Sequence, residues 1–92
     1  MRRAAKKDLN HNAIRDTLRG IGVTVIETYQ LGGGFPDLLW TWRGATGLIE
    51  VKGKGEKLTE AEAKFHTDYP GALAVVVTPA DAYRAVGAEV EV

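Results

Sequence analysis

Cysteine is absent from the sequence, which excludes disulfide bonds and thiolate metal sites. An excess of either charge is also absent, since 12 lysine and arginine residues balance 12 aspartate and glutamate residues. The overall charge therefore gives no reason by itself to expect binding to nucleic acid. No apolar run reaches the roughly 18 residues that a membrane-spanning helix needs, and no apolar signal segment follows the basic N-terminus. We therefore expect a soluble cytoplasmic protein without a membrane partner.

The chain has 92 residues, which is enough for one domain over residues 1–92 and too few for two. Its positive charge is clustered in two places. The first cluster lies in residues 1–7, which we expect to form a flexible basic arm, and comprises Arg2, Arg3, Lys6 and Lys7. The second cluster comprises Lys52, Lys54 and Lys57. Each cluster has two interpretations, as contacts to phosphate groups or as ordinary solvated surface.

Hydrophobic periodicity and turn residues divide the chain into helices and strands. Helices are predicted over residues 8–19 and 59–69 and from residue 79 onwards, and strands over residues 23–29, 37–42, 46–52 and 73–77. The order α-β-β-β-α-β-α predicts an α/β fold in which helices flank a central mixed sheet. The continuous apolar run over residues 73–77 predicts a strand that is buried on both faces. Residues 89–92 are expected either to add an edge strand or to fray.

Polar residues mark where the helices begin. The first helix has three candidate caps, Asp8, Asn10 and Asn12. Thr59 and Glu62 form the capping-box pattern at the start of the second helix. Thr78 is the expected cap of the last helix, because Pro79 suits the first helical position.

Three ionisable residues are brought together by the predicted hairpin of residues 37–52. Asp37 begins one strand and Glu50 lies near the end of the next, so the two are expected side by side. Lys52 shares a face with Glu50, because side chains alternate along a strand. Two carboxylates supply oxygen ligands that Mg²⁺ prefers, and the carbonyl of Val51 is a further candidate ligand.

This arrangement suits metal-assisted hydrolysis of a phosphodiester bond. The metal can polarise the phosphate and activate a water molecule. The lysine beside it can orient that water, help to deprotonate it, or balance charge on the phosphorus. An ordinary cross-strand pair of a glutamate and a lysine at the edge of a sheet explains the same three residues equally well.

The surrounding motifs resemble a known family. They are Gly33-Gly34-Phe35-Pro36-Asp37-Leu38-Leu39, Leu48-Ile49-Glu50-Val51-Lys52 and Leu58-Thr59, followed by Phe65-His66 and Gly71. The run from about Asp8 to Ala85 is similar to the small stand-alone VRR-NUC (virus-type replication-repair) nucleases of phages and bacteria, within the PD-(D/E)XK superfamily. The resemblance implies a small restriction-endonuclease-like fold and a metal-dependent DNA endonuclease.

The resemblance also implies roles for individual residues. Asp37 and Glu50 would bind Mg²⁺ or Mn²⁺, and Lys52 would be the catalytic lysine. Stand-alone members resemble Holliday junction resolvases and act as homodimers, so branched DNA in phage replication or repair is an expected substrate. A phage-encoded member would work in the cytoplasm of the host cell. DNA contacts are expected from Gly33, Gly34, Lys54, Lys57 and the basic arm.

Two positions depart from the family pattern. The family usually carries a glutamate in the first helix, where this chain has Ala13, with Asn10 and Asp16 as candidate substitutes. The glutamine of the second helix is replaced by Glu62, which is either an acidic catalytic residue or only a helix cap. A catalytically degenerate DNA-binding module of the same fold is therefore the main alternative. A toxin or a structural dimer that uses the sheet only for association is a third.

Several aromatic and imidazole side chains have ordinary interpretations. Trp40 and Trp42 share one face of their strand, and core or dimer packing is favoured over base stacking. His66 is expected to be packed or exposed to solvent in preference to acting in acid-base catalysis. A phosphate contact by His11, close to the basic arm, is a further hypothesis.

Overall fold

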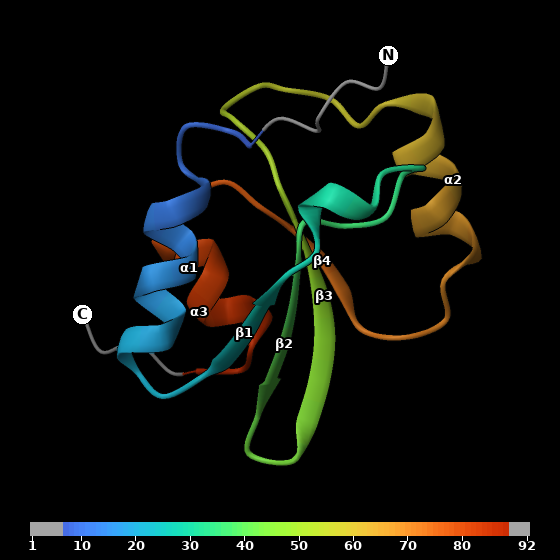
Figure 1. The fold of residues 1–92 in the computed structure, drawn as a ribbon. Coiled ribbons are helices and arrows are strands. Elements are labelled where there is room, and N and C mark those ends of the chain that lie inside the picture. Colours follow the sequence, from blue (N-terminus) through green and yellow to red (C-terminus); the bar gives the residue numbers. More distant parts are fainter. Residues whose placement is uncertain (1–6, 89–92) are drawn as a thin grey trace.

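A computed structural model describes residues 7–88 of the chain, and their elements follow the predicted order (Figure 1). The helices are α1 (His11–Gly20), α2 (Glu60–Asp68) and α3 (Pro79–Ala85). The strands are β1 (Thr24–Glu27), β2 (Leu38–Trp42), β3 (Ala45–Val51) and β4 (Leu73–Val76). A short 3-10 helix, η1 (Tyr29–Leu31), was not predicted. The expectations for residues 89–92, and for all of the basic arm except Lys7, lie outside the described residues.

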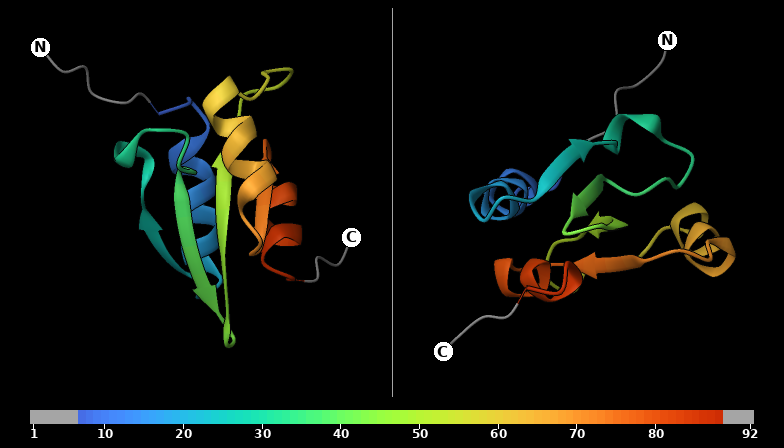
Figure 2. Two further views of the ribbon diagram at one scale, coloured as in Figure 1. Left: turned by 90° about the vertical axis from the view of Figure 1, so that its right-hand side faces the viewer. Right: turned by 90° about the horizontal axis from the view of Figure 1, so that it is seen from below.

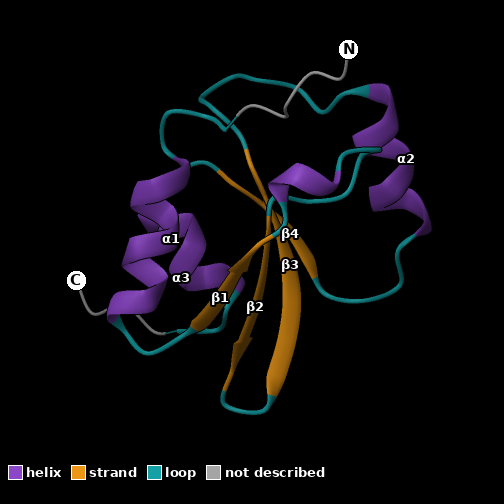
Figure 3. Cartoon of the chain, in the orientation of Figure 1, coloured by secondary structure: helices purple, strands orange, loops and turns teal. Residues whose placement is uncertain are grey.

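The four strands form one mixed sheet in the order β1-β2-β3-β4 (Figure 3). β2 is antiparallel to both β1 and β3, and β4 is parallel to β3. Arg43 and Gly44 make the turn between β2 and β3 with φ angles of 52° and 82°. Two successive positive φ angles are typical of a type I′ turn, whose twist matches that of the flanking strands. The predicted α/β class with a mixed sheet is confirmed.

The helices lie on opposite sides of this sheet. α1 and α3 lie together on one side, and α2 stands apart from them on the other (Figure 2). The core between the sheet and the pair α1 and α3 contains Ile14, Leu18, Val23, Val25, Leu38, Trp40, Ile49, Val51, Val76, Ala82 and Val86. Trp40 is 4% exposed, so the prediction that it packs in the core is confirmed. Within residues 7–88, no helix is long and apolar enough to cross a membrane.

The prediction that the fourth strand is buried on both faces is wrong. Val76 is fully buried towards the core, but Val75 is 44% exposed on the other face. Among the described strands β4 is the last in the sheet, and α2 contains no buried residue that would cover Val75. The apolar run of residues 73–77 therefore forms a strand at the edge of the described sheet. α3 covers only the face of this strand that points towards the core.

The first strand is shorter than predicted. β1 ends at Glu27, and the N–H of Thr28 still donates a hydrogen bond to the carbonyl of Asp37 at 2.7 Å. The chain then turns into η1, where the N–H of Leu31 donates to the carbonyl of Thr28 at 3.0 Å. Tyr29 is β-prone, but it falls where the chain leaves the sheet.

The capping predictions for α2 and α3 are confirmed. The Thr59 hydroxyl accepts from the N–H of Glu62, and the Glu62 carboxylate accepts from the N–H of Thr59. Thr78 and Asp81 form the same reciprocal pair at α3, where Pro79 takes the first helical position. Both boxes satisfy N–H groups that have no partner within their helix.

Asn10 occupies the N-cap position of α1 without capping it through its side chain. Its amide group donates instead to the carbonyls of Lys52 at 3.1 Å and Val77 at 2.6 Å. These two bonds tie the start of α1 to the ends of β3 and β4. The residues just before α1 are thereby held beside the end of β3, where the predicted site lies.

Candidate active site

Asp37 and Glu50 lie opposite each other at the ends of neighbouring strands. The register pairs Leu38 with Ile49, and the N–H of Asp37 donates to the carbonyl of Ile49 at 3.0 Å. One step further along both strands, Asp37 faces Glu50. The Asp37 Oδ2 atom also accepts a hydrogen bond of 2.8 Å from the N–H of Val51, which fixes its carboxylate beside β3. The predicted juxtaposition of the two carboxyl groups is therefore present.

Lys52 shares this face of the sheet and is almost completely buried, with an exposed fraction of 5%. Its ammonium Nζ lies 3.8 Å from Glu50 Oε2 and 3.8 Å from Glu56 Oε2. Its shortest contact, at 2.7 Å, is to Glu62 Oε1 on α2. Three carboxylates therefore surround the lysine, and one of them comes from the helix on that side of the sheet.

These side chains line a cavity of about 500 Å³. Its lining residues are Lys7, Asp8, Leu9, Asp37, Glu50, Lys52, Glu56 and Glu62. Five carboxyl groups thus face two ammonium groups, an excess of negative charge that favours a cation. The overall charge of zero conceals this local imbalance.

The electrostatics of the cavity are strongly perturbed at Glu50. Burial, together with the charge and hydrogen bond of Asp37, raises the pKa of Glu50 to about 9. A carboxyl group that is buried and lies beside another carboxyl group disfavours its charged form. Without a cation, Glu50 therefore retains its proton at neutral pH.

The other charged groups of the cavity respond to one another. Burial lowers the pKa of Lys52, but the hydrogen bond and charge of Glu62 outweigh burial and raise the pKa overall. Burial raises the pKa of Glu62, whereas the hydrogen bonds from Lys52 and Thr59 prevail and lower it. Burial and the neighbouring Glu56 carboxyl raise the pKa of Asp8. Lys52 and Glu62 consequently form a charged pair.

The donor set of the cavity fits a Mg²⁺ ion. Glu50 is 2% exposed and its Oε1 atom has no hydrogen-bond partner, as expected for a ligand oxygen directed at a cation. Within residues 7–88 no three acidic or histidine side chains are arranged to hold a metal between them. Asp37 and Glu50 are adjacent, so they would be the two protein carboxylates of the site; Mg²⁺ usually takes one or two and keeps several waters.

The backbone of Val51 is also available to this site. Its N–H points towards β2, where Asp37 accepts it. The N–H and C=O of one strand residue point to the same side of the strand. The carbonyl of Val51 therefore faces Asp37, as its predicted role as a further ligand requires.

Neither substitute considered for the missing first-helix glutamate lines the cavity. Ala13 is exposed. The amide group of Asn10 donates to two backbone carbonyls, and Asp16 forms an ion pair with Arg15 at 2.8 Å. Asp8 does line the cavity, although the sequence indicated only a possible cap there. The signal that could have placed Asp8 is its position just before α1. Asn10 holds the start of α1 beside the end of β3, so Asp8 lies close to the site.

The residues expected to contact DNA are distributed unevenly around the cavity. Lys54 and Lys57 are exposed on the loop after β3 and do not line it. Gly34 has a φ of +87°, and a Cβ atom there would lie 2.4 Å from the carbonyl oxygen of Ala61. Gly34 therefore allows its loop to approach α2, whereas Gly33 faces open space. Arg2, Arg3 and Lys6 lie outside the described residues.

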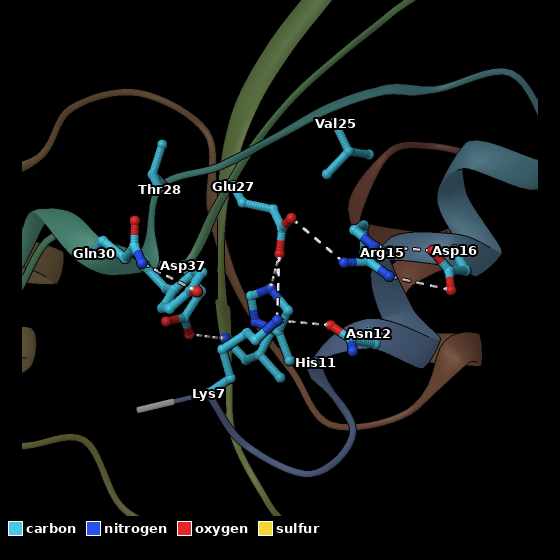
Figure 4. Close-up of polar contacts among 12 residues, drawn as sticks. Lys7, His11, Asn12, Arg15, Asp16, Val25, Glu27, Thr28, Gln30 and Asp37 are labelled. Carbon is cyan, nitrogen blue, oxygen red and sulfur yellow. Dashed lines mark hydrogen bonds and ion pairs between the residues drawn. The ribbon is translucent and has the colours of Figure 1, made fainter. Parts of the chain in front are cut away.

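Lys7 connects the cavity with a second group of charged residues (Figure 4). Its ammonium donates to Asn12 at 3.1 Å and lies 3.9 Å from Glu27, which also accepts from Arg15 at 3.3 Å. His11 is 1% exposed and its Nε2 atom lies 2.9 Å from Glu27. The hypothesis that His11 contacts phosphate is therefore wrong, because the His11 ring is buried at the start of α1.

His66 does not line the cavity either. It is half-buried in α2, and its Nε2 atom is buried without a hydrogen-bond partner. Burial lowers its pKa, against the charge of Glu62. The sequence predicted that His66 is either packed or exposed to solvent, and the half-buried ring corresponds to the packed alternative.

Comparisons with family models, curated proteins and solved structures find no match for this chain. The proposal that follows therefore depends on the geometry of the cavity and on the motifs in the sequence.

Proposed function

We propose that this chain is a metal-dependent DNA endonuclease of the VRR-NUC type with a small restriction-endonuclease-like fold. The observation that carries the proposal is that Asp37 lines one cavity together with the buried Glu50 and Lys52. The mixed sheet supports it, because the ends of β2 and β3 bring the three side chains to the same face.

Asp37 and Glu50 would hold the metal, with the carbonyl of Val51 as a further ligand. A bound Mg²⁺ or Mn²⁺ supplies a Lewis acid for the phosphate and lowers the pKa of a water molecule. The hydrogen bond from the N–H of Val51 keeps the Asp37 carboxylate in place before any ion arrives. Such prearrangement lowers the cost of binding.

Lys52 would act on the phosphate itself. Its ammonium group is surrounded by Glu50, Glu56 and Glu62, which favours the charged form. An ammonium group donates hydrogen bonds and has no acceptor. We assign Lys52 the role of stabilising the negative charge that develops on the phosphate oxygens during attack by water.

DNA would reach the cavity across a rim of basic residues. Lys54 and Lys57 on the exposed loop are suited to phosphates beside the scissile bond, and Lys7, which lines the cavity, is suited to a further phosphate. The exposed loop of Gly33 leaves room for the backbone of the nucleic acid. A homodimer acting on branched DNA would use two such cavities to cut two strands.

Cleavage of labelled DNA tests this function. The substrates are a four-way junction, a flap, a linear duplex and a single strand, each with Mg²⁺, Mn²⁺ or chelator. We expect cleavage that requires metal and is abolished by Asp37→Ala and by Lys52→Ala. The variant Lys64→Ala is the matched control for loss of a lysine, because Lys64 is exposed on α2 and, within residues 7–88, forms an ion pair with Asp68 alone.

The degenerate DNA-binding module gives the opposite pattern. Its specific support is Ala13, which leaves the first helix without the acidic residue of the family pattern and is itself exposed. Binding of DNA that is equal with Mg²⁺ and with chelator, together with no cleavage of any substrate, would favour this module over the nuclease.

A further inference from the structure

Glu62 makes two contacts with one oxygen atom. Its Oε1 accepts the N–H of Thr59 at 2.8 Å, as part of the capping box of α2. The same atom lies 2.7 Å from the Nζ atom of Lys52 on the sheet. A residue that the sequence left as either a cap or an active-site group is therefore engaged in both contacts.

The contact to Lys52 also fixes how α2 sits on the sheet. α2 contains no buried residue, in contrast to α1 and α3. Its contacts to the remaining chain include the close approach of Gly34 to Ala61 and an edge-to-face pair of Phe35 with Phe65 at 5.2 Å. Glu62 thus supplies an ionic contact between a weakly buried helix and the floor of the cavity.

The geometry around Lys52 shows why such a contact is needed. A lysine side chain has many rotamers, and holding its ammonium at one point costs conformational entropy. The two other carboxylates lie at 3.8 Å, beyond ordinary hydrogen-bond distance, and the Glu56 side chain is 43% exposed. Glu62, whose side chain is 18% exposed, makes the one contact of hydrogen-bond length to the Lys52 ammonium group among the described residues.

We propose that Glu62 is a positioning residue, which uses the capping box of α2 to hold the Lys52 ammonium at the phosphate position of the cavity. This inference rests on the proposed nuclease function for the reaction that Lys52 serves. The backbone N–H of Thr59 holds the Glu62 carboxylate, and this carboxylate in turn holds the lysine.

Two variants separate this role from helix capping. Thr59→Ala removes the hydroxyl half of the capping box and leaves the Glu62 carboxylate free to contact Lys52. Glu62→Ala removes the other half and also removes the contact to Lys52. Both variants lose half of the capping box of α2, and Glu62→Ala also removes the nearest carboxylate of the buried Lys52, so we expect the larger decrease in Tm in Glu62→Ala.

The first readout is the ¹H–¹⁵N signal of the Lys52 ammonium group, which is observable only when its exchange with water is slow. We expect this signal in the wild type and in Thr59→Ala, and we expect its loss in Glu62→Ala. The second readout is the single-turnover rate of DNA cleavage at saturating DNA. It should fall about tenfold to hundredfold in Glu62→Ala with little change in Kd, and much less in Thr59→Ala.

The proposal is overturned if Glu62→Ala and Thr59→Ala behave alike in both readouts, because Glu62 is then only a cap. It is also overturned if the ammonium signal is lost without any effect on the cleavage rate. A wild type that cleaves no DNA would refute the nuclease function, and the ammonium signal would still decide whether Glu62 holds Lys52.

Discussion

Replacing Glu50 by glutamine should stabilise the metal-free protein at neutral pH. The carboxyl group of Glu50 is buried beside Asp37, and its pKa is raised to about 9 from an ordinary value of 4.5. Between these two values the folded protein keeps a proton that the unfolded chain releases. The free energy of unfolding therefore falls as pH rises from 4.5 towards 9, at about 1.4 kcal/mol per pH unit. Glutamine does not titrate and retains an N–H donor for Asp37, so it avoids this loss.

The size of this loss in the free energy of unfolding depends on how far the pH lies above the unfolded pKa of Glu50. At pH 7 the wild type has lost about 3 kcal/mol relative to pH 4.5 through this one group. We therefore expect Glu50→Gln to be more stable than the wild type by about 3 kcal/mol at pH 7, with a difference that approaches zero near pH 4.5. Urea unfolding at several pH values in the presence of chelator measures this difference.

The matched control is Glu60→Gln, since Glu60 is exposed in the first turn of α2. It removes the same charge from the surface and should change stability by less than about 0.5 kcal/mol at every pH. A Glu50→Gln variant that is less stable than the wild type at pH 7, or equally stable at all pH values, would refute the account of Glu50 as a desolvated carboxyl group.

Other predictions concern the fold. Asp81→Ala should destabilise the protein by about 1–2 kcal/mol, because Asp81 accepts from two backbone N–H groups at the start of α3. Urea unfolding at pH 7 measures this change, and an unchanged free energy of unfolding would contradict the capping role. Hydrogen bonds from those N–H groups lower the pKa of Asp81, so its contribution is present above the unfolded value of 3.8 and is lost as pH falls through the lower folded pKa. Gly34→Ala should cost more stability than Gly33→Ala, because both glycines have positive φ but only Gly34 abuts α2; equal costs would refute the close packing. Gly47→Ala should shift the tryptophan fluorescence, since its Cβ would lie 2.7 Å from the indole nitrogen of Trp40, and an unchanged spectrum would contradict that contact.

Local patterns predicted most elements of this fold correctly. The hairpin of residues 37–52, the caps Thr59 and Thr78 and the alternation along β2 and β3 depend on a few neighbouring residues, so the sequence contains what is needed to place them. The alternation in particular brought Glu50 and Lys52 to one face. The spacing of Thr59 and Glu62 also predicted that Glu62 caps α2, but it did not predict the contact of Glu62 with Lys52.

Features that depend on distant residues were missed. The exposure of Val75 depends on where α2 packs and on β4 being the last described strand of the sheet. The sequence of residues 73–77 determines neither of these. The place of Asp8 in the cavity depends on the amide of Asn10, which reaches carbonyl groups on two strands. Such contacts join residues that are far apart in the chain, and an apolar run or a single polar residue does not encode them.

The most direct test of the central claim is DNA cleavage by Glu50→Gln in Mg²⁺, measured beside the wild type and Glu60→Gln. The proposed site needs the carboxylate of Glu50 for its metal, and a neutral amide is a poor replacement. We predict that Glu50→Gln is folded and at least as stable as the wild type but does not cleave, whereas Glu60→Gln cleaves normally. Cleavage by Glu50→Gln at the wild-type rate would contradict a metal-dependent active site at Asp37 and Glu50.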